Sequence, residues 1–329
     1  KKGKIGYTPN EGLPELRDAV AAEYRGRGIQ AQRENVIVTT ASTGALNVVF
    51  GTLLNPGDQV LIPELHYPLY DVIPPRLGGE VVEYRLEADM NIDTDDLLGK
   101  ITPQTKVILL NSPSNPTGKV TPSDDLRKLS KETENHATLY FVSDEIYSTL
   151  VFNTDSRFVN SMAEIDPRTI VIDGLSKRTA MTGKRLGWIV APAEVIREAT
   201  KVQQSGYACA PTDSQYAALP ILNGECDPEI HNIKPKLAHG MHDMERGLDG
   251  VLEFVKPDGS FYIFIDISAY GTSVEVSKRL IEEFNVVTIP GEAFGETGKN
   301  YIRISFAGNP EDISRGVYTM KEAFTEWAA

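Results

Sequence analysis

An α/β fold, built on a mostly parallel central sheet with helices on both faces, is the architecture that most of this sequence predicts. Short apolar runs alternate with amphipathic stretches between residues 36 and 205, and turn signals such as Asn-Pro-Gly and Ala-Pro separate them. Several runs are apolar at consecutive positions, as strands buried on both faces require. This alternation indicates parallel strands joined by helical crossovers.

The individual elements follow from these runs in chain order. Strands are predicted at residues 36–39, 59–62, 81–84, 106–110, 140–142, 169–172 and 188–190. Helical periodicity predicts helices over residues 44–54, 123–135 and 194–205.

The pattern changes near residue 230. Residues 230–251 predict one long helix despite Pro235, and alternating strands follow within residues 260–268, 285–290 and 301–307. Two further helices are predicted over residues 273–284 and 310–327. In a chain of 329 residues we therefore expect a large α/β domain over 1–236 and a smaller α+β domain over 237–329.

The composition restricts the class of partner. Lys and Arg number 33 against 46 Asp and Glu, so the formal net charge of −13 disfavours binding to nucleic acid or acidic membranes. Two cysteines provide no disulfide framework, and no apolar run reaches the ~18 residues that a membrane helix needs. The sequence therefore predicts a cytoplasmic protein without a nucleic-acid or membrane partner.

The segment "IVIDGLSKRTAMTGKRLG" places Ser176 and Lys177 directly after an apolar strand, with Arg185 eight residues beyond the lysine. Burial penalises the charge of a lysine, so an amine at this position suits a nucleophile better than a solvated cation. The alternative interpretation is an ordinary Ser-Lys pair on the surface.

Other polar residues follow predicted strands, and open α/β sheets bind ligands at the carboxyl ends of their strands. In "TTASTGALN", the residues Ala41-Ser42-Thr43 open a helix, whose free N–H groups suit a phosphate unless the segment is a plain N-cap. In "LLNSPSNPTGKV", the amides of Asn111 and Asn115 follow a strand, either as ligand donors or as turn residues.

Three more segments contain candidates of the same kind. Asp144 ends a strand in "LYFVSDEIYSTL" with Tyr147 three residues later, either as a functional carboxylate or as a helix cap beside a packed tyrosine. Tyr67 precedes a proline and suits stacking on a planar ligand, whereas His66 and Tyr70 are weaker candidates. Arg303 in "NYIRISFAG" is either an ion-pair partner or a clamp for a carboxylate.

Together and in this order, these motifs resemble the class I/II aminotransferases, which are fold type I enzymes that use pyridoxal 5′-phosphate (PLP). The motifs "NSPSNPTG", "SDEIY", "SKRTAMTGKRLGW" and "RISFA" carry the resemblance, which runs from Tyr7 to Arg303. The amino-acid sequence of the lysine motif is similar to that of many prokaryotic aspartate, aromatic and kynurenine aminotransferases.

The resemblance implies a role for each matching residue. Lys177 would hold PLP as an internal Schiff base, and Asp144 would lie beside the pyridine nitrogen. Asn115 and Tyr147 would donate to the phenolate oxygen of the ring, and Tyr67 would stack on it. The implied phosphate site consists of Ala41, Ser42, Thr43, Ser176 and Arg185. Arg303, together with Asn115, would bind the substrate carboxylate. Tyr7 would reach the phosphate of the other subunit, which implies a homodimer with shared active sites.

The resemblance implies an aminotransferase that moves an amino group from an L-amino acid to a 2-oxo acid by a ping-pong mechanism. A PLP-dependent lyase or cyclase on the same fold is the first alternative, because the same groups serve elimination and cyclisation. An effector-sensing domain of a transcription regulator is the second. His239 and His242 have helical spacing without further evident ligands, so we predict no metal site.

Overall fold

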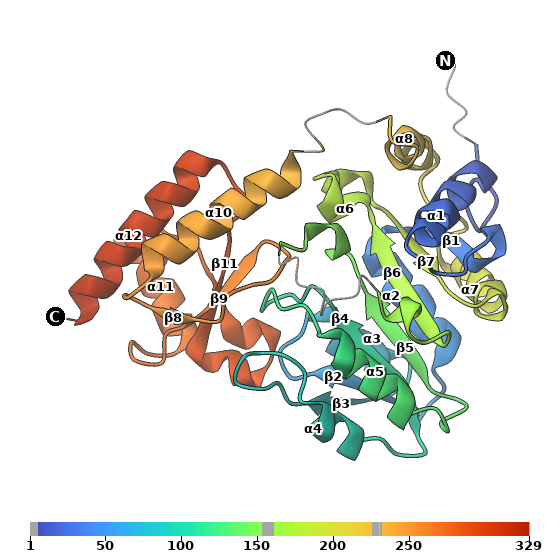
Figure 1. Cartoon of the computed structure of the whole chain (residues 1–329), viewed down its shortest axis with the longest axis horizontal. Helices are drawn as coiled ribbons and strands as arrows, with labels where there is room; N and C mark the ends of the chain where they lie inside the picture. Colours follow the sequence, from blue (N-terminus) through green and yellow to red (C-terminus); the bar gives the residue numbers. More distant parts are fainter. Residues whose placement is uncertain (1–5, 153–160, 226–229, 231, 329) are drawn as a thin grey trace.

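A computed structural model of the chain describes residues 6–152, 161–225, 230 and 232–328. The described residues form a sheet of seven strands and a sheet of four, which occupy different parts of the molecule in Figure 1. The larger sheet consists of β1 (Val36–Thr40), β2 (Gln59–Pro63), β3 (Glu80–Tyr84), β4 (Thr105–Asn111), β5 (Tyr140–Asp144), β6 (Thr169–Gly174) and β7 (Leu186–Val190).

The strand order of the larger sheet is β1-β7-β6-β5-β4-β2-β3. Strand β7 runs antiparallel to both β1 and β6, and the other neighbours pair in parallel. The seven predicted strands are therefore all present, and the prediction of a mostly parallel sheet is confirmed.

Helices cover both faces of this sheet, as Figure 1 shows. They are α1 (Pro14–Gly26), α2 (Ala41–Leu53), α3 (Leu69–Arg76), α4 (Thr94–Gly99), α5 (Ser123–Glu132), α6 (Leu175–Arg178), α7 (Ala193–Gly206) and α8 (Thr212–Leu222). Alternate residues of a strand face opposite layers. Thus Ile170 and Ile172 pack with α2 and α7, whereas Val171 between them packs with α1 and α8.

Some predicted helices need correction. The helix predicted over residues 44–54 begins at Ala41, so the small residues after β1 form its first turn. The helix predicted over residues 230–251 is shorter in the structure, where α10 spans Ile233–Leu248 between Asn232 and Asp249; residue 231 lies outside the described residues. Pro235 lies in the first turn of α10, where a missing N–H is tolerated. Helices α1, α3, α4, α6 and α8 were not assigned from the sequence.

The smaller sheet consists of β8 (Glu253–Phe254), β9 (Tyr262–Asp266), β10 (Ile289–Pro290) and β11 (Tyr301–Ser305), in the order β10-β11-β9-β8. Its paired strands are antiparallel, and α10, α11 (Ser273–Phe284) and α12 (Pro310–Ala328) belong to the same part of the chain. The strand predicted over 285–290 is reduced to two residues in β10, and Asn285 instead forms the left-handed C-cap of α11. Ile146 and Tyr147 of the larger part join the core of this smaller unit.

Short 3-10 helices link these elements, namely η1 (Arg33–Asn35), η2 (Ser148–Leu150), η3 (Met162–Glu164), η4 (Thr182–Lys184), η5 (Gly291–Phe294) and η6 (Glu296–Asn300). The topology also places the strand ends. Strands β4, β5 and β6 end at Asn111, Asp144 and Gly174 along one edge, and β6 continues directly into α6. Across the described ranges, no helix combines the length and apolar character needed to cross a membrane.

Candidate active site

A cavity of about 300 Å³ lies where β4, β5 and β6 end and where the smaller sheet approaches them. The candidates that line it are Ala41, Ser42, Thr43, Tyr67, Asn115, Asp144, Tyr147, Ser176, Lys177, Arg185 and Arg303. The structure therefore brings together every selected site residue except Tyr7. Tyr7 is 92% exposed in this single chain and lies outside the cavity lining.

Asp144 is buried at the end of β5 with its carboxylate directed by two donors. The Tyr70 hydroxyl donates to one carboxylate oxygen at 2.8 Å, and the backbone N–H of Ile146 donates to the other at 3.2 Å. Burial raises the pKa of Asp144 to about 6, although both hydrogen bonds and the charge of Lys177 act in the opposite direction. No α-helix begins directly after Asp144, so this residue is not the helix cap of the alternative interpretation.

Lys177 lies in the short helix α6 and lines the cavity. Burial lowers the pKa of its amine, and the charges of Arg303 and Arg185 lower it further, against the opposing charge of Asp144. Its Nζ lies 6.0 Å from the centre of the Tyr147 ring. Because deprotonation makes an amine nucleophilic, this environment suits covalent chemistry better than a surface ion pair.

Arg303 enters the cavity from β11 and is held by both parts of the chain. One terminal N–H group donates to the Asn115 Oδ1 at 2.7 Å, and Asn111 Oδ1 in turn accepts from the backbone N–H of Asn115 at 2.8 Å. The Nε of Arg303 is buried and has no hydrogen-bond partner among the described residues. A guanidinium with free donors in a cavity suits a carboxylate ligand.

The N-terminus of α2 faces the same cavity. The preceding residue, Thr40, makes no capping hydrogen bond with its side chain, so the plain N-cap interpretation is wrong for this segment. Ala41 adopts a left-handed φ of 60°, and its N–H donates to the carbonyl of Arg185 at 3.1 Å. A Cβ on Gly187 would lie 2.6 Å from the Ala41 carbonyl carbon, so β7 and this turn pack in direct contact. The free N–H groups and Arg185 together suit an anion.

The weaker candidates separate in the structure. Tyr70 lines the cavity and supports Asp144, and its ring meets the Tyr67 ring edge-on at 5.7 Å. His66 is buried outside the cavity lining, with its Nδ1 3.0 Å from the carbonyl of Pro63. His66 is therefore a packed residue that contacts the backbone, not a ligand-binding one. Groups of three or more potential metal ligands are absent from the part of the chain that the structure describes.

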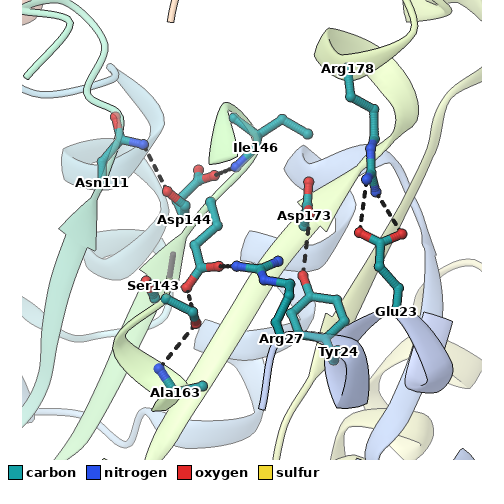
Figure 2. Close-up of polar contacts among 12 residues, drawn as sticks. Glu23, Tyr24, Arg27, Asn111, Ser143, Asp144, Ile146, Ala163, Asp173 and Arg178 are labelled. Carbon is teal, nitrogen blue, oxygen red and sulfur yellow. Dashed lines mark hydrogen bonds and ion pairs between the residues drawn. The ribbon is translucent and has the colours of Figure 1, made fainter. Parts of the chain in front are cut away.

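A second polar network connects α1 with the ends of β5 and β6, and it includes Glu145, the residue that follows Asp144. Figure 2 shows α1 reaching the ends of β5 and β6 through Glu23, Tyr24 and Arg27. The Arg27 guanidinium donates to the Glu145 carboxylate at 2.9 Å, which also accepts from the Ser143 hydroxyl at 2.9 Å. The two neighbouring carboxylates thus have different partners, since Asp144 accepts from Tyr70 in the cavity and Glu145 accepts from Arg27 at the end of α1.

The second half of this network surrounds Asp173. The Tyr24 hydroxyl donates to its carboxylate at 3.2 Å, and the N–H of Gly174 donates at 2.6 Å. Burial raises the pKa of Asp173 to about 7, against the opposing charge of Arg178. Arg178, which follows Lys177, donates to both oxygens of the Glu23 carboxylate at 3.1 and 2.8 Å. The network therefore attaches α6 to α1.

Comparison with known proteins identifies the family. A family model described as aminotransferase class I and II matches residues 2–319. The chain is 37% identical to a probable aspartate aminotransferase of Methanocaldococcus jannaschii, over 98% of this chain and 86% of that relative. It is 33% identical to aromatic-amino-acid aminotransferase 2 of Thermococcus litoralis, over 99% of this chain and 85% of that relative.

Solved structures agree with the sequence relatives. An aspartate aminotransferase double mutant of Thermus thermophilus matches with a TM-score of 0.92 and 31% identity, over 98% of this chain and 84% of that chain. An aminotransferase from Mycobacterium tuberculosis matches with a TM-score of 0.93 and 30% identity, over 98% and 85% of the two chains. The chain belongs to the class I and II aminotransferase family and has its fold. It is an aminotransferase that depends on PLP.

Proposed function

We propose that PLP binds in the cavity at the strand ends, with its phosphate at the N-terminus of α2 beside Ser42, Thr43, Ser176 and Arg185. The uncapped helix terminus and the Arg185 charge support this assignment, since both favour an anion. In the same proposal, Asp144 faces the pyridine nitrogen, and the Tyr67 ring stacks on the cofactor. Asn115 and Tyr147 provide donors for its ring oxygen.

PLP, when bound, accepts the electron density released at a substrate Cα during proton removal. The ionised Asp144 stabilises positive charge at the pyridine nitrogen, because its pKa of about 6 leaves it mostly charged at pH 7. Lys177 holds the cofactor through its Nζ and, once freed by the substrate amine, takes the proton from Cα. Burial and two arginines lower the pKa of this amine, which supports both roles.

Arg303 is proposed to bind the substrate α-carboxylate through two parallel N–H donors, with Asn115 fixing one edge of the guanidinium. This contact orients the Cα–H bond toward Lys177. Amino transfer from an L-amino acid to a 2-oxo acid is the overall reaction, in two half-reactions. The relatives are named for amino transfer, which favours it over elimination or cyclisation and over a role in transcription.

The convergence of Lys177, Asp144 and Arg303 on one cavity carries this proposal. Borohydride reduction of the PLP-loaded protein, followed by peptide mapping, should find the adduct on Lys177. A Lys177→Ala variant should lose the adduct, whereas the matched variant Lys184→Ala should keep it. An adduct on Lys184 in the wild type would show that the site assignment is wrong.

We also propose a homodimer in which Tyr7 reaches the phosphate site of the partner subunit. Its 92% exposure in the single chain supports a role outside its own cavity. A mixed dimer of Lys177→Ala and Tyr7→Phe subunits tests the arrangement. If Tyr7 acts in trans, one site carries both defects and the other carries neither, so about half of the wild-type activity returns. A mixed dimer without that recovery would contradict the shared site.

The cellular location and the domain division are proposals of the same kind. A cytoplasmic location is supported by the low cysteine content, and cell fractionation would test it. A division into residues 1–236 and 237–329 is supported by the seven strands before the boundary and the four after it among the described residues, and the cut between 236 and 237 falls in the first turn of α10. Expression of the two parts as separate chains, with urea unfolding of each, would test whether they are independent units.

A further inference from the structure

We propose that Tyr262, which the sequence analysis did not select, is a positioning residue with two separable functions. Its hydroxyl orients the Tyr147 phenol, and its ring orients the Arg303 guanidinium. The inference rests on the roles proposed above for Tyr147 and Arg303. Through Tyr262, a residue of the smaller sheet, that sheet influences both the Tyr147 contact with the cofactor and the Arg303 contact with the substrate.

The fold explains why Tyr262 reaches both partners. It is the first residue of β9, is 7% exposed and lines the cavity. Strand β9 pairs with β11 so that Phe264 lies opposite Arg303. Residues two apart on a strand share a face, so Tyr262 and Arg303 are diagonal neighbours within reach of each other.

The hydroxyl of Tyr262 lies within hydrogen-bond distance of the Tyr147 hydroxyl. The Tyr147 hydroxyl donates to the Tyr262 oxygen at 3.3 Å, and the two rings meet edge-on at 5.9 Å. Burial raises the pKa of Tyr147, and the contact with Tyr262 raises it further, so the Tyr147 phenol keeps its proton at neutral pH.

Each phenol has one proton to donate and an oxygen that also accepts. When Tyr147 donates to the ring oxygen of the cofactor, it no longer donates to Tyr262. The Tyr262 hydroxyl can then rotate and donate to the Tyr147 oxygen, which makes Tyr147 a stronger donor because linked hydrogen bonds polarise one another. Tyr262 thereby influences the cofactor without touching it.

The ring of Tyr262 supports Arg303 from within the cavity. The central carbon of the guanidinium lies 4.1 Å from the centre of the Tyr262 ring and 4.6 Å from that of Phe294. Aromatic faces attract a guanidinium and favour a parallel plane. With one N–H group fixed on Asn115 at 2.7 Å, these rings restrict the plane in which Arg303 presents its remaining donors to a carboxylate.

Two substitutions separate the functions. Tyr262→Phe removes the hydroxyl and keeps the ring, whereas Tyr262→Leu removes both. The first measurement is the pH midpoint of the absorbance change of PLP in the substrate-free enzyme. This midpoint should rise by about half a pH unit in Tyr262→Phe. Without the Tyr262 hydroxyl, Tyr147 is a weaker donor, so more negative charge stays on the ring oxygen of the cofactor. That charge favours the protonated form of the linked Lys177 nitrogen.

The second measurement is the affinity for carboxylates that lack an amine. Succinate and 3-phenylpropanoate are the probes, and the change in PLP absorbance reports their binding. Tyr262→Phe should change the dissociation constant less than about twofold, and Tyr262→Leu should weaken binding about tenfold. Tyr84→Phe is the matched control. It removes a buried hydroxyl that donates to the Leu109 carbonyl at 2.9 Å, outside the cavity lining, and should change neither quantity.

A double variant isolates the path of the effect. In a Tyr147→Phe background, Tyr262→Phe should cause no further shift of the midpoint, because Tyr262 acts through Tyr147. An unchanged midpoint in Tyr262→Phe, or a shift that persists without Tyr147, would overturn the hydroxyl function. Equal carboxylate affinities for the Phe and Leu variants would overturn the ring function. If Tyr147→Phe alone leaves the midpoint unchanged, the role proposed for Tyr147 is wrong. That outcome contradicts the proposed function and is distinct from a failure of the Tyr262 inference.

Discussion

Replacing Asp173 by Asn should stabilise the cofactor-free protein, and the gain should grow with pH. Burial raises the pKa of Asp173 to about 7 from an ordinary value of 3.8. The folded carboxyl therefore binds its proton more tightly than the unfolded one, so stability is lost as pH rises from about 4 toward 7. Asn keeps the shape of the protonated group and can still accept from Gly174 and pair with Tyr24.

The size of the effect follows from the two pKa values. Their difference corresponds to about 4 kcal/mol of unfolding free energy when the pH is well above 7. The same relation gives about 2 kcal/mol for the change between pH 5.5 and pH 8.0. The charges of Arg178, Arg27 and Glu23 face Asp173 and are already included in its raised pKa.

Urea unfolding of the wild type and of Asp173→Asn at pH 5.5 and 8.0, at one protein concentration, measures this difference. The advantage of the variant should be about 2 kcal/mol larger at pH 8.0. Asp18→Asn, on the helix α1 that contacts Asp173 through Tyr24, is the control. The pKa of Asp18 is lowered by its hydrogen bond with Arg33, so this variant should gain no stability over that range. Parallel pH dependences of the Asp173→Asn variant and the wild type would refute the reasoning.

Three further predictions concern the cavity. Asp144→Asn should retain PLP but slow Cα–H removal by about 10²-fold or more, because a neutral partner no longer stabilises the charged pyridine; single-turnover absorbance measures this, and a wild-type rate would contradict it. Arg303→Lys should raise KM and lower kcat, since lysine keeps the charge but lacks the two parallel N–H groups. Steady-state kinetics with several amino-acid substrates would measure the changes in KM and in kcat separately. In the cofactor-free protein, acetylation of Lys177 should reach its half-maximal rate at a lower pH than that of Lys128, whose pKa is raised by a hydrogen-bonded carboxylate. Arg303→Met should move the Lys177 midpoint upward, and an unchanged midpoint would exclude the proposed charge effect.

The cavity could be predicted from the sequence because its residues lie at fixed positions relative to strands. Asn115, Asp144 and Lys177 each follow the end of an apolar run, and neighbouring parallel strands end at one edge of the sheet. Local pattern was therefore sufficient to place residues that are far apart in the chain. The predicted helix range began at residue 44, three residues after Ala41, because Ser and Thr are ambiguous between a cap and a first helical turn.

Residues whose roles depend on tertiary packing are harder to recognise in the sequence than the residues that follow strands. Tyr262 lies in "SFYIFIDIS", where alternation predicts an ordinary core strand and does not distinguish a cavity residue. Glu23 and Arg27 look like the solvated face of a helix that the sequence analysis did not assign. One signal was available, namely a single Asp at position 173 in an otherwise apolar strand, because such a carboxyl needs a partner.

The attachment of α1 to the strand ends has a consequence for synthesis of the protein. The hydrogen bonds of Glu23, Tyr24 and Arg27 join residues 118 to 155 positions apart. At about 5–20 residues per second, a ribosome needs about 6 to 30 s to make the partners after it has made α1. During that interval Glu23 and Arg27, four residues apart, are suitably spaced to pair with each other. Folding then exchanges this local pair for two distant, partly buried pairs, Arg27–Glu145 and Arg178–Glu23. The helix α6, which carries Lys177, is therefore attached to α1 only after the ribosome has made residue 178.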